Sequence, residues 1–278
     1  MAQKILVTTD LSANSKAGVR FAIQLAAQNG SSLVFCHVSQ LPKPTRWTES
    51  RYQHYVDDQL APVREKLEKF VAAEYERAGS RPGKYKCVAI TGVSVDRSII
   101  AYAGEIKANF ICMSTRGAGA ITKFLGTNAS VILTTSPVPV LIIPQNYKAK
   151  PIKKIFYSSD FNDLGYELKK VSDFTAPLKG KILVYHYDYL LNVKETVRKL
   201  KKTSAPYKRR NVAFTFEKQN IEEPLVDHLR RDVKKSKASM AVLFTKQNRG
   251  WYERIFFSSK TAELSFATTV PLLVFRKR

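Results

Sequence analysis

The chain has 278 residues, of which 44% are hydrophobic and 25% charged, as is usual for a folded globular protein. This length holds one large domain or two of ordinary size, each with a core of its own. No apolar run approaches the roughly 18 to 20 residues that cross a membrane, so we expect no transmembrane segment. The N-terminus, MAQKILVTTDLS, enters a strand directly and has none of the regions of an export signal.

The net charge is +23, and it is unevenly distributed. Residues 1–150 contain 19 Lys and Arg against 10 Asp and Glu, whereas the shorter remainder contains 27 against 13. A field of this sign favours anionic partners, namely a nucleotide, a nucleic acid or an anionic membrane, without choosing among them.

Three cysteines, Cys36, Cys87 and Cys112, lie in apolar, strand-like runs and lack the short paired spacings that bind zinc. We expect them to be reduced residues of the core. A cytoplasmic location follows from that expectation, because disulfides form in oxidising compartments.

Strands and helices are expected to alternate along the first half. Apolar runs predict strands at 4–9, 32–38, 85–91 and 110–114, and amphipathic runs predict helices between them, ending near residues 28, 78 and 107. A Gly-rich loop, a helix and a short strand bounded by Pro137 and Pro144 follow. This alternation predicts a parallel sheet with helices on both faces.

The pattern restarts after the polar segment QNYKAKP at 145–151. The sequence from Lys153 repeats that from Lys4 element for element, so that Asp160 corresponds to Asp10 and His186 to His37. The chain is therefore an internal duplication, and we expect two domains, residues 1–147 and 148–278.

The loop before the last helix of the first half has the features of a phosphate site. It contains Gly117, Gly119 and Gly126 and leads into a helix that opens with Thr127 and Asn128. Backbone N–H groups at a helix N-terminus are unpaired and lie at the positive end of the helix dipole. We therefore expect phosphate to bind there.

At these residues the chain resembles the universal stress protein family. Nucleotide-binding members carry G-x2-G-x9-G-[S/T] between the fourth strand and the fourth helix, followed by an apolar-Pro-apolar last strand. The resemblance covers the whole chain in two copies. It implies two tandem doubly wound, Rossmann-like α/β domains, each with five parallel strands in the order 3-2-1-4-5. It also implies a stress-response protein that binds ATP or another adenine nucleotide in its first domain and signals by occupancy.

The resemblance also implies the site residues of the first domain. Thr8, Thr9 and Val38 would form the adenine pocket. Asp10 would accept hydrogen bonds from ribose hydroxyls or help to hold Mg through phosphate. The residues that would line the base, the sugar and the phosphates are Met113, Ser114, Gly117, Gly126, Thr127 and Asn128.

Two departures separate this chain from the family pattern. Ser114 stands where the motif has its first glycine, and eight residues instead of nine separate Gly117 from Gly126. The alternative interpretation is a Gly-rich turn that only connects strand to helix.

The corresponding loop of the second half predicts a closed site. Its sequence, KQNRGWYERIFFSSKTAEL, has one glycine and four large aromatic residues, Trp251, Tyr252, Phe256 and Phe257. Side chains of this size would stand where phosphate needs bare backbone. Asp160 is then expected to cap a helix or to play another structural role.

No legible catalytic motif is present, and neither a catalytic residue nor a metal site is predicted. His37 and His186 are expected to be duplicated packing residues, and His54 and His228 to be solvated. We expect binding, with ATP hydrolysis slow at most.

Two alternatives remain open. One is a nucleotide-free interaction scaffold for a protein partner that the sequence does not identify. The other is a nucleic-acid binder that uses the basic segment KETVRKLKKTSAPYKRR at 194–210. The favoured interpretation of this segment is a helix with a basic solvent-exposed face that is broken at Pro206.

The last strands of the two halves are strongly apolar. They begin at Val138 and Val270 and end at Ile143 and Phe275, and the family order puts each at a sheet edge. Exposed edges of this kind promote aggregation. We therefore expect the two strands to pair as an internal pseudo-dimer, with a homodimer as a further option.

Overall fold

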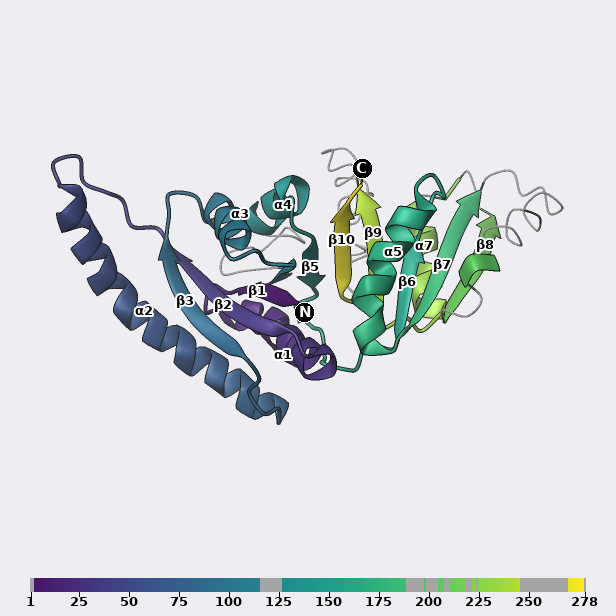
Figure 1. Ribbon diagram of the computed structural model, residues 1–278, viewed down its shortest axis with the longest axis horizontal. Coiled ribbons are helices and arrows are strands. Elements are labelled where there is room, and N and C mark those ends of the chain that lie inside the picture. The colour runs from purple at the N-terminus through teal and green to yellow at the C-terminus, as the bar shows by residue number, and fades with distance from the viewer. Residues whose placement is uncertain are drawn as a thin grey trace. The chain divides into compact units, whose positions relative to one another are not determined.

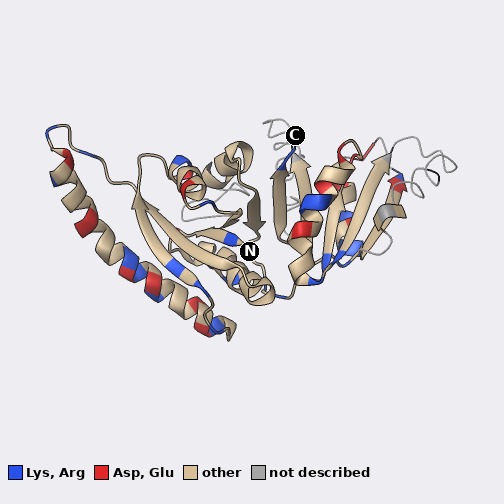
Figure 2. Ribbon diagram, viewed as in Figure 1, with Lys and Arg blue, Asp and Glu red and all other residues tan. Residues whose placement is uncertain are grey.

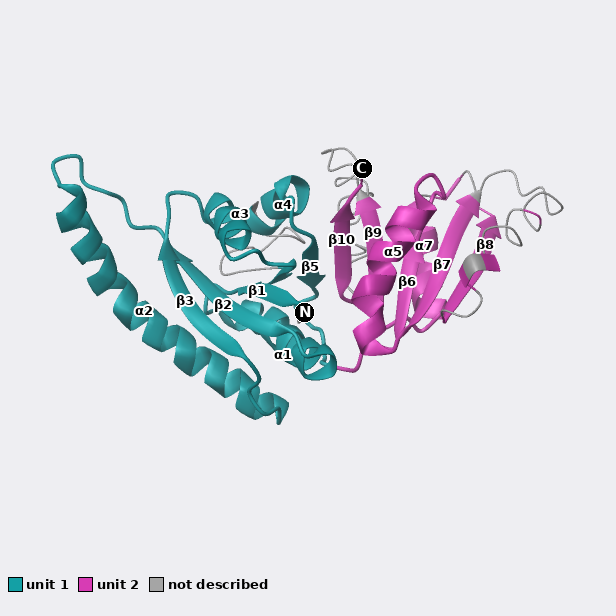
Figure 3. Cartoon of the chain, in the orientation of Figure 1, with its two compact units in different colours: residues 1–149 teal, residues 150–278 magenta. Residues whose placement is uncertain are grey.

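The computed structural model describes residues 3–115, 127–188, 198, 205–207, 211–218, 222–223, 225–245 and 270–277. The chain forms two compact units, a first unit of residues 1–149 and a second unit of residues 150–278 (Figure 3). The sequence repeat predicted a domain boundary near residue 148.

The first unit alternates strands with helices (Figure 1). Its elements are β1 (Lys4–Thr8), η1 (Ala13–Ser15), α1 (Lys16–Asn29), β2 (Ser32–Ser39), α2 (Glu49–Ala78), β3 (Tyr85–Thr91), α3 (Val95–Glu105), β4 (Phe110–Ser114), α4 (Thr127–Thr135) and β5 (Val140–Ile143). All strand pairs are parallel, and the order is β3-β2-β1-β4-β5.

The second unit repeats this plan. Its described elements are β6 (Lys154–Ser158), α5 (Leu164–Thr175), η2 (Ala176–Leu178), β7 (Lys181–Asp188), η3 (Ala205–Tyr207), β8 (Val212–Lys218), α7 (Leu225–Lys235), β9 (Met240–Thr245) and β10 (Leu272–Arg276). Its strands are also parallel, in the order β8-β7-β6-β9-β10. The predicted α/β fold with strand order 3-2-1-4-5 is confirmed in both units.

The central strands are continuous apolar runs because helices cover both of their faces. Ile5, Leu6 and Val7 of β1 have no exposed surface, and neither do Ile155, Phe156 and Tyr157 of β6. Each unit therefore has its core around its own sheet.

Local signals set the ends of the helices. Gly30 ends α1 in the left-handed conformation, with φ of 73°, and its N–H donates to the Ala26 carbonyl. Thr48 caps α2 by accepting a hydrogen bond from the Arg51 N–H. Figure 2 shows acidic and basic residues mixed along α2, the longest helix of the first unit.

The three cysteines are free thiols. Burial raises the pKa of Cys36 to about 12 and that of Cys87 to about 11, and it raises the pKa of Cys112 as well. All three are thus protonated at neutral pH. Within the described ranges, no helix combines the length and the apolar character needed to cross a membrane.

Candidate functional site

Strand order reverses in the first unit between β1 and β4, because β2 lies on the other side of β1. In an open parallel sheet, ligands bind beyond the carboxyl ends of the strands at such a point. Register pairs Thr8 with Cys36 and Val7 with Cys112. The sheet therefore brings the end of β1 close to Val38 and Met113.

The residues at this edge range from buried to exposed. Thr8 and Met113 are buried, Val38 is half-buried and Asp10 is exposed. Thr8, Val38 and Met113 thus lie at or near the carboxyl ends of three neighbouring strands, and the exposed Asp10 lies just beyond the end of β1. An edge with both apolar side chains and an exposed carboxylate can offer apolar and polar contacts to a ligand.

Asp10 sits in a tight turn between β1 and α1. Its Oδ1 accepts hydrogen bonds from the Ser12 N–H at 3.1 Å and from the Ser12 hydroxyl at 2.7 Å. Thr9 supports the turn, since its hydroxyl oxygen accepts from the Leu11 N–H at 3.0 Å and bonds the Ser15 hydroxyl at 2.7 Å. The Thr9 side chain and N–H are engaged within the protein, the N–H with the Cys36 carbonyl.

Ser114 links β4 to the start of α1. Its hydroxyl accepts from the Gly18 N–H at 2.9 Å and donates to the Ser15 carbonyl at 3.1 Å. Because the side chain is directed to α1, any contact of Ser114 with a sugar would come from its backbone. Serine replaces the first glycine of the family motif here and has a structural use.

The phosphate-binding part of the predicted site is described only at its end. Gly117, Gly119 and Gly126 lie outside the described residues, whereas Thr127 is the first residue of α4 and Asn128 is exposed. A helix that follows a parallel strand runs back along the sheet, so its N-terminus lies at the carboxyl edge of the strands. The start of α4 therefore lies on the same edge as Asp10.

In the second unit, Asp160 corresponds to Asp10, and its carboxylate contacts a lysine. Lys277, at the end of β10, donates to Asp160 Oδ2, and the Asn162 N–H donates to Oδ1 at 3.1 Å. Burial by itself raises the pKa of Asp160, but the contacts with Lys277 and Asn162 outweigh it and lower the pKa overall. In the alignment of the two repeats, the neutral Gln145 of the first unit corresponds to Lys277. The Gln145 side chain donates to the Asn14 side chain.

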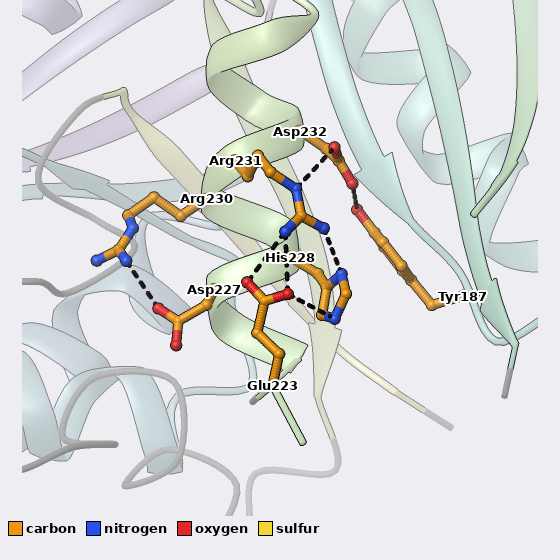
Figure 4. A network of polar contacts seen from close by, with 7 residues as sticks. All are labelled: Tyr187, Glu223, Asp227, His228, Arg230, Arg231 and Asp232. Atoms are coloured by element: carbon orange, nitrogen blue, oxygen red, sulfur yellow. Dashed lines mark hydrogen bonds and ion pairs between the residues drawn. The ribbon is translucent and has the colours of Figure 1, made fainter. Parts of the chain in front are cut away.

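Two further counterparts in the second unit are large. Tyr187 takes the place of Val38, and its hydroxyl donates to Asp232 Oδ2 at 2.8 Å (Figure 4). Phe244 takes the place of Ser114 and stacks on Phe275 with ring centroids 5.0 Å apart. These two larger residues, which the sequence analysis did not single out, make their contacts within the second unit, while Trp251, Tyr252, Phe256 and Phe257 lie outside the described residues.

The prediction that His228 is solvated is wrong. His228 is 2% exposed, with Nδ1 2.5 Å from Arg231 Nη2 and Nε2 3.2 Å from Glu223 Oε2 (Figure 4). A guanidinium can only donate, so His228 Nδ1 accepts this hydrogen bond. The helical pattern of α7 puts residues 228 and 232 one turn apart on one face, which was the available signal for burial. His54, in contrast, is exposed.

The other two histidines, His37 and His186, make equivalent contacts in their own units. His37 Nδ1 lies 2.9 Å from the Thr9 carbonyl, and His186 Nδ1 lies 2.9 Å from the Ser159 carbonyl.

Across the part of the chain that the structure describes, no group of three His, Cys, Asp or Glu side chains could hold a metal ion.

A model of the universal stress protein family matches residues 1–144, more than half of the chain. The chain belongs to the universal stress protein family. This universal stress protein is similar over its whole length to one from Archaeoglobus fulgidus DSM 4304, with a TM-score of 0.71 and 17% identity over 99% of this chain and 98% of that chain. It is also similar to a functionally unknown protein from Pseudomonas aeruginosa PAO1, with a TM-score of 0.61 and 17% identity over 99% of this chain and 92% of that one. At these identities the likeness concerns the fold. A search of the curated proteins finds no match.

Proposed function

We propose that the first unit binds an adenine nucleotide, ATP in the first instance, beyond the carboxyl ends of β1 and β4, and that occupancy is its signal in the stress response. The second unit does not bind nucleotide. The three free thiols favour a cytoplasmic location for the protein, because cysteines stay reduced in that compartment.

The observation that carries this proposal is the contrast between the two copies of one site. The first unit has Val38 where the second has Tyr187, and Gln145 where the second has Lys277. Tyr187 and Lys277 both contact carboxylates of their own unit. The changes that close the second copy are absent from the first.

In the proposed complex, Thr8, Val38 and Met113 contact the base. Asp10 accepts hydrogen bonds from ribose hydroxyls, or helps to hold Mg through phosphate. The backbone at Gly117 and Gly126 and the donors of Thr127 and Asn128 hold the phosphates. The roles of Gly117, Gly126, Thr127 and Asn128 follow from the resemblance of this loop to the family motif. No residue is assigned a catalytic role.

The experiment that tests the proposal is a thermal-shift titration with millimolar Mg-ATP. The wild-type protein should be stabilised, because a ligand that binds only the folded state raises the melting temperature. Gly126→Val should abolish the shift by adding a side chain where the backbone approaches phosphate, whereas Asp160→Ala should retain it. Absence of any shift in the wild type would favour the nucleotide-free scaffold.

A further inference from the structure

The turn that carries Asp10 contains a residue in a strained backbone conformation. Leu11 has φ of 63°, in the left-handed region, although it is not glycine. This conformation costs about 1 to 2 kcal/mol for a residue with a side chain. It persists only where surrounding contacts impose it.

His37 is one of the groups that impose this conformation. Its Nδ1 bonds the Thr9 carbonyl at 2.9 Å, and the Thr9 hydroxyl holds the Leu11 N–H at 3.0 Å. The Thr9 carbonyl and the Asp10 N–H belong to one planar peptide unit. A hydrogen bond to the Thr9 carbonyl therefore fixes the orientation of the peptide plane that leads into Asp10.

The chemistry of this bond makes it independent of the charge on the ring. A carbonyl oxygen can only accept, so His37 Nδ1 carries the hydrogen and donates. A protonated imidazole also donates from Nδ1. The contact is thus available to both forms of the histidine.

The second unit contains the same turn. Phe161 has φ of 65°, its N–H donates to the Ser159 hydroxyl at 3.1 Å, and His186 Nδ1 bonds the Ser159 carbonyl at 2.9 Å. Asn162 N–H donates to Asp160 Oδ1 at 3.1 Å, the distance found between Ser12 and Asp10. Both copies have kept the histidine, the left-handed residue and the aspartate together.

The second copy also shows what this turn does with its carboxylate. The Lys277 ammonium, at the carboxyl end of β10, donates to Asp160 Oδ2. The turn thus directs the carboxylate toward a hydrogen-bond donor located at the carboxyl edge of its sheet.

We infer that His37 is a positioning residue for ligand binding: through the Thr9 peptide it holds the Asp10 carboxylate in the orientation that accepts hydrogen bonds from the hydroxyl groups of a ribose. This inference rests on the proposed function, and it adds a residue that does not itself touch the ligand.

Calorimetric titration of the full chain tests the inference with two ligands, Mg-ATP and Mg-2′,3′-dideoxy-ATP. His37→Leu should weaken Mg-ATP about tenfold, as expected for the loss of about one hydrogen bond. The dideoxy ligand lacks the hydroxyls, so it should bind His37→Leu and wild type equally. His37→Asn puts an amide N–H near the position of Nδ1 and should retain the affinity for Mg-ATP to within about threefold.

His186→Leu is the matched control, because it removes the same bond from the second unit. It should leave both affinities unchanged. Equal weakening of the two ligands by His37→Leu, or an equal effect of His186→Leu, would show that His37 supports only the fold and would overturn the inference.

Amide hydrogen exchange gives a measurement that needs no ligand. In His37→Leu the Leu11 and Ser12 amides should exchange faster than in wild type, because their acceptors, the Thr9 hydroxyl and the Asp10 carboxylate, lose their support. Unchanged exchange at both amides overturns the inference whatever the nucleotide result. Faster exchange in a protein that binds no nucleotide supports the role of His37 in the turn and rejects the proposed function alone.

Discussion

Gly18 allows the first turn of α1 to approach the end of β4. A Cβ added there would lie 3.0 Å from the Ser114 nitrogen and 3.2 Å from the Met113 carbonyl carbon, both backbone atoms. Backbone yields less readily than the end of a side chain. Gly18→Ala should therefore lower the free energy of unfolding by about 1 to 3 kcal/mol in urea denaturation.

Gly104 provides the control for that substitution, since it lies in α3 and an added Cβ would meet nothing within 4 Å. Gly104→Ala should raise the free energy of unfolding by about 0.5 kcal/mol, because alanine restricts the unfolded chain. Equal effects of the two substitutions would contradict the close contact between α1 and β4.

Glu167 is a buried carboxyl group in α5. Its side chain is 2% exposed, Oε2 accepts from the Tyr157 hydroxyl at 2.5 Å, and Oε1 is 3.8 Å from Lys277 Nζ. Burial raises the pKa of Glu167 above its ordinary value of 4.5, against the lowering effect of Tyr157 and Lys277. The folded state therefore holds this proton at pH values at which the unfolded chain has lost it.

The pH dependence of stability follows from that difference. As pH rises above 4.5, the unfolded state binds fewer protons than the folded state, so this group lowers the free energy of unfolding. Glu167→Gln does not titrate. The stability of this variant relative to wild type should therefore increase between about pH 4 and pH 7, measured by urea denaturation. A difference that stays constant across this range would disprove the upward shift.

At the scale of elements, one hydrogen bond ties α7 to β7. The Tyr187 hydroxyl donates to the carboxylate of Asp232, a residue that is 3% exposed. Burial raises the pKa of Tyr187. Tyr187→Phe leaves a buried carboxylate without this donor. It should lower the free energy of unfolding by about 1 to 3 kcal/mol.

A double-mutant cycle with Asp232→Asn measures that coupling. The effect of Tyr187→Phe should be smaller in the Asp232→Asn background, because a neutral amide needs the donor less. Additive effects of the two substitutions would mean that the hydrogen bond contributes little.

Local sequence was enough to predict most elements. Continuous apolar runs predicted β1 and β2 to within a residue at each end, and the predicted end of the second helix near residue 78 agrees with the end of α2 at Ala78. The contacts of Tyr187 and Lys277 in the second unit were not predictable in this way. Tyr187 bonds a residue 45 positions away, and Lys277 bonds one 117 positions away, so both depend on the completed sheet.

The candidate site was predictable in part for the same reason. The family motif and the strand ends indicated Asp10 and Met113, whereas the structural roles of Thr9 and Ser114 depend on contacts with α1 and its preceding turn. No local pattern shows that a hydroxyl at the end of β4 bonds the backbone of Gly18.

At the scale of the whole molecule, the pairing of the two last strands stays a prediction from their composition. Val140 in β5 and Leu273 in β10 are each buried. Val140→Asp in the full chain should lower the melting temperatures of both units if the strands pair. The chain has two tryptophans, Trp47 in the first unit and Trp251 in the second, and single-tryptophan variants report each unit separately. A second unit that melts unchanged in Val140→Asp would contradict the pairing.

Calorimetric titration of the full-length protein with Mg-ATP tests the nucleotide site most directly. We predict one binding site per chain, lost in Asp10→Ala and retained in Asp160→Ala, because the second copy already holds its carboxylate with Lys277. No heat of binding at millimolar Mg-ATP, or two equivalent sites per chain, would contradict the account.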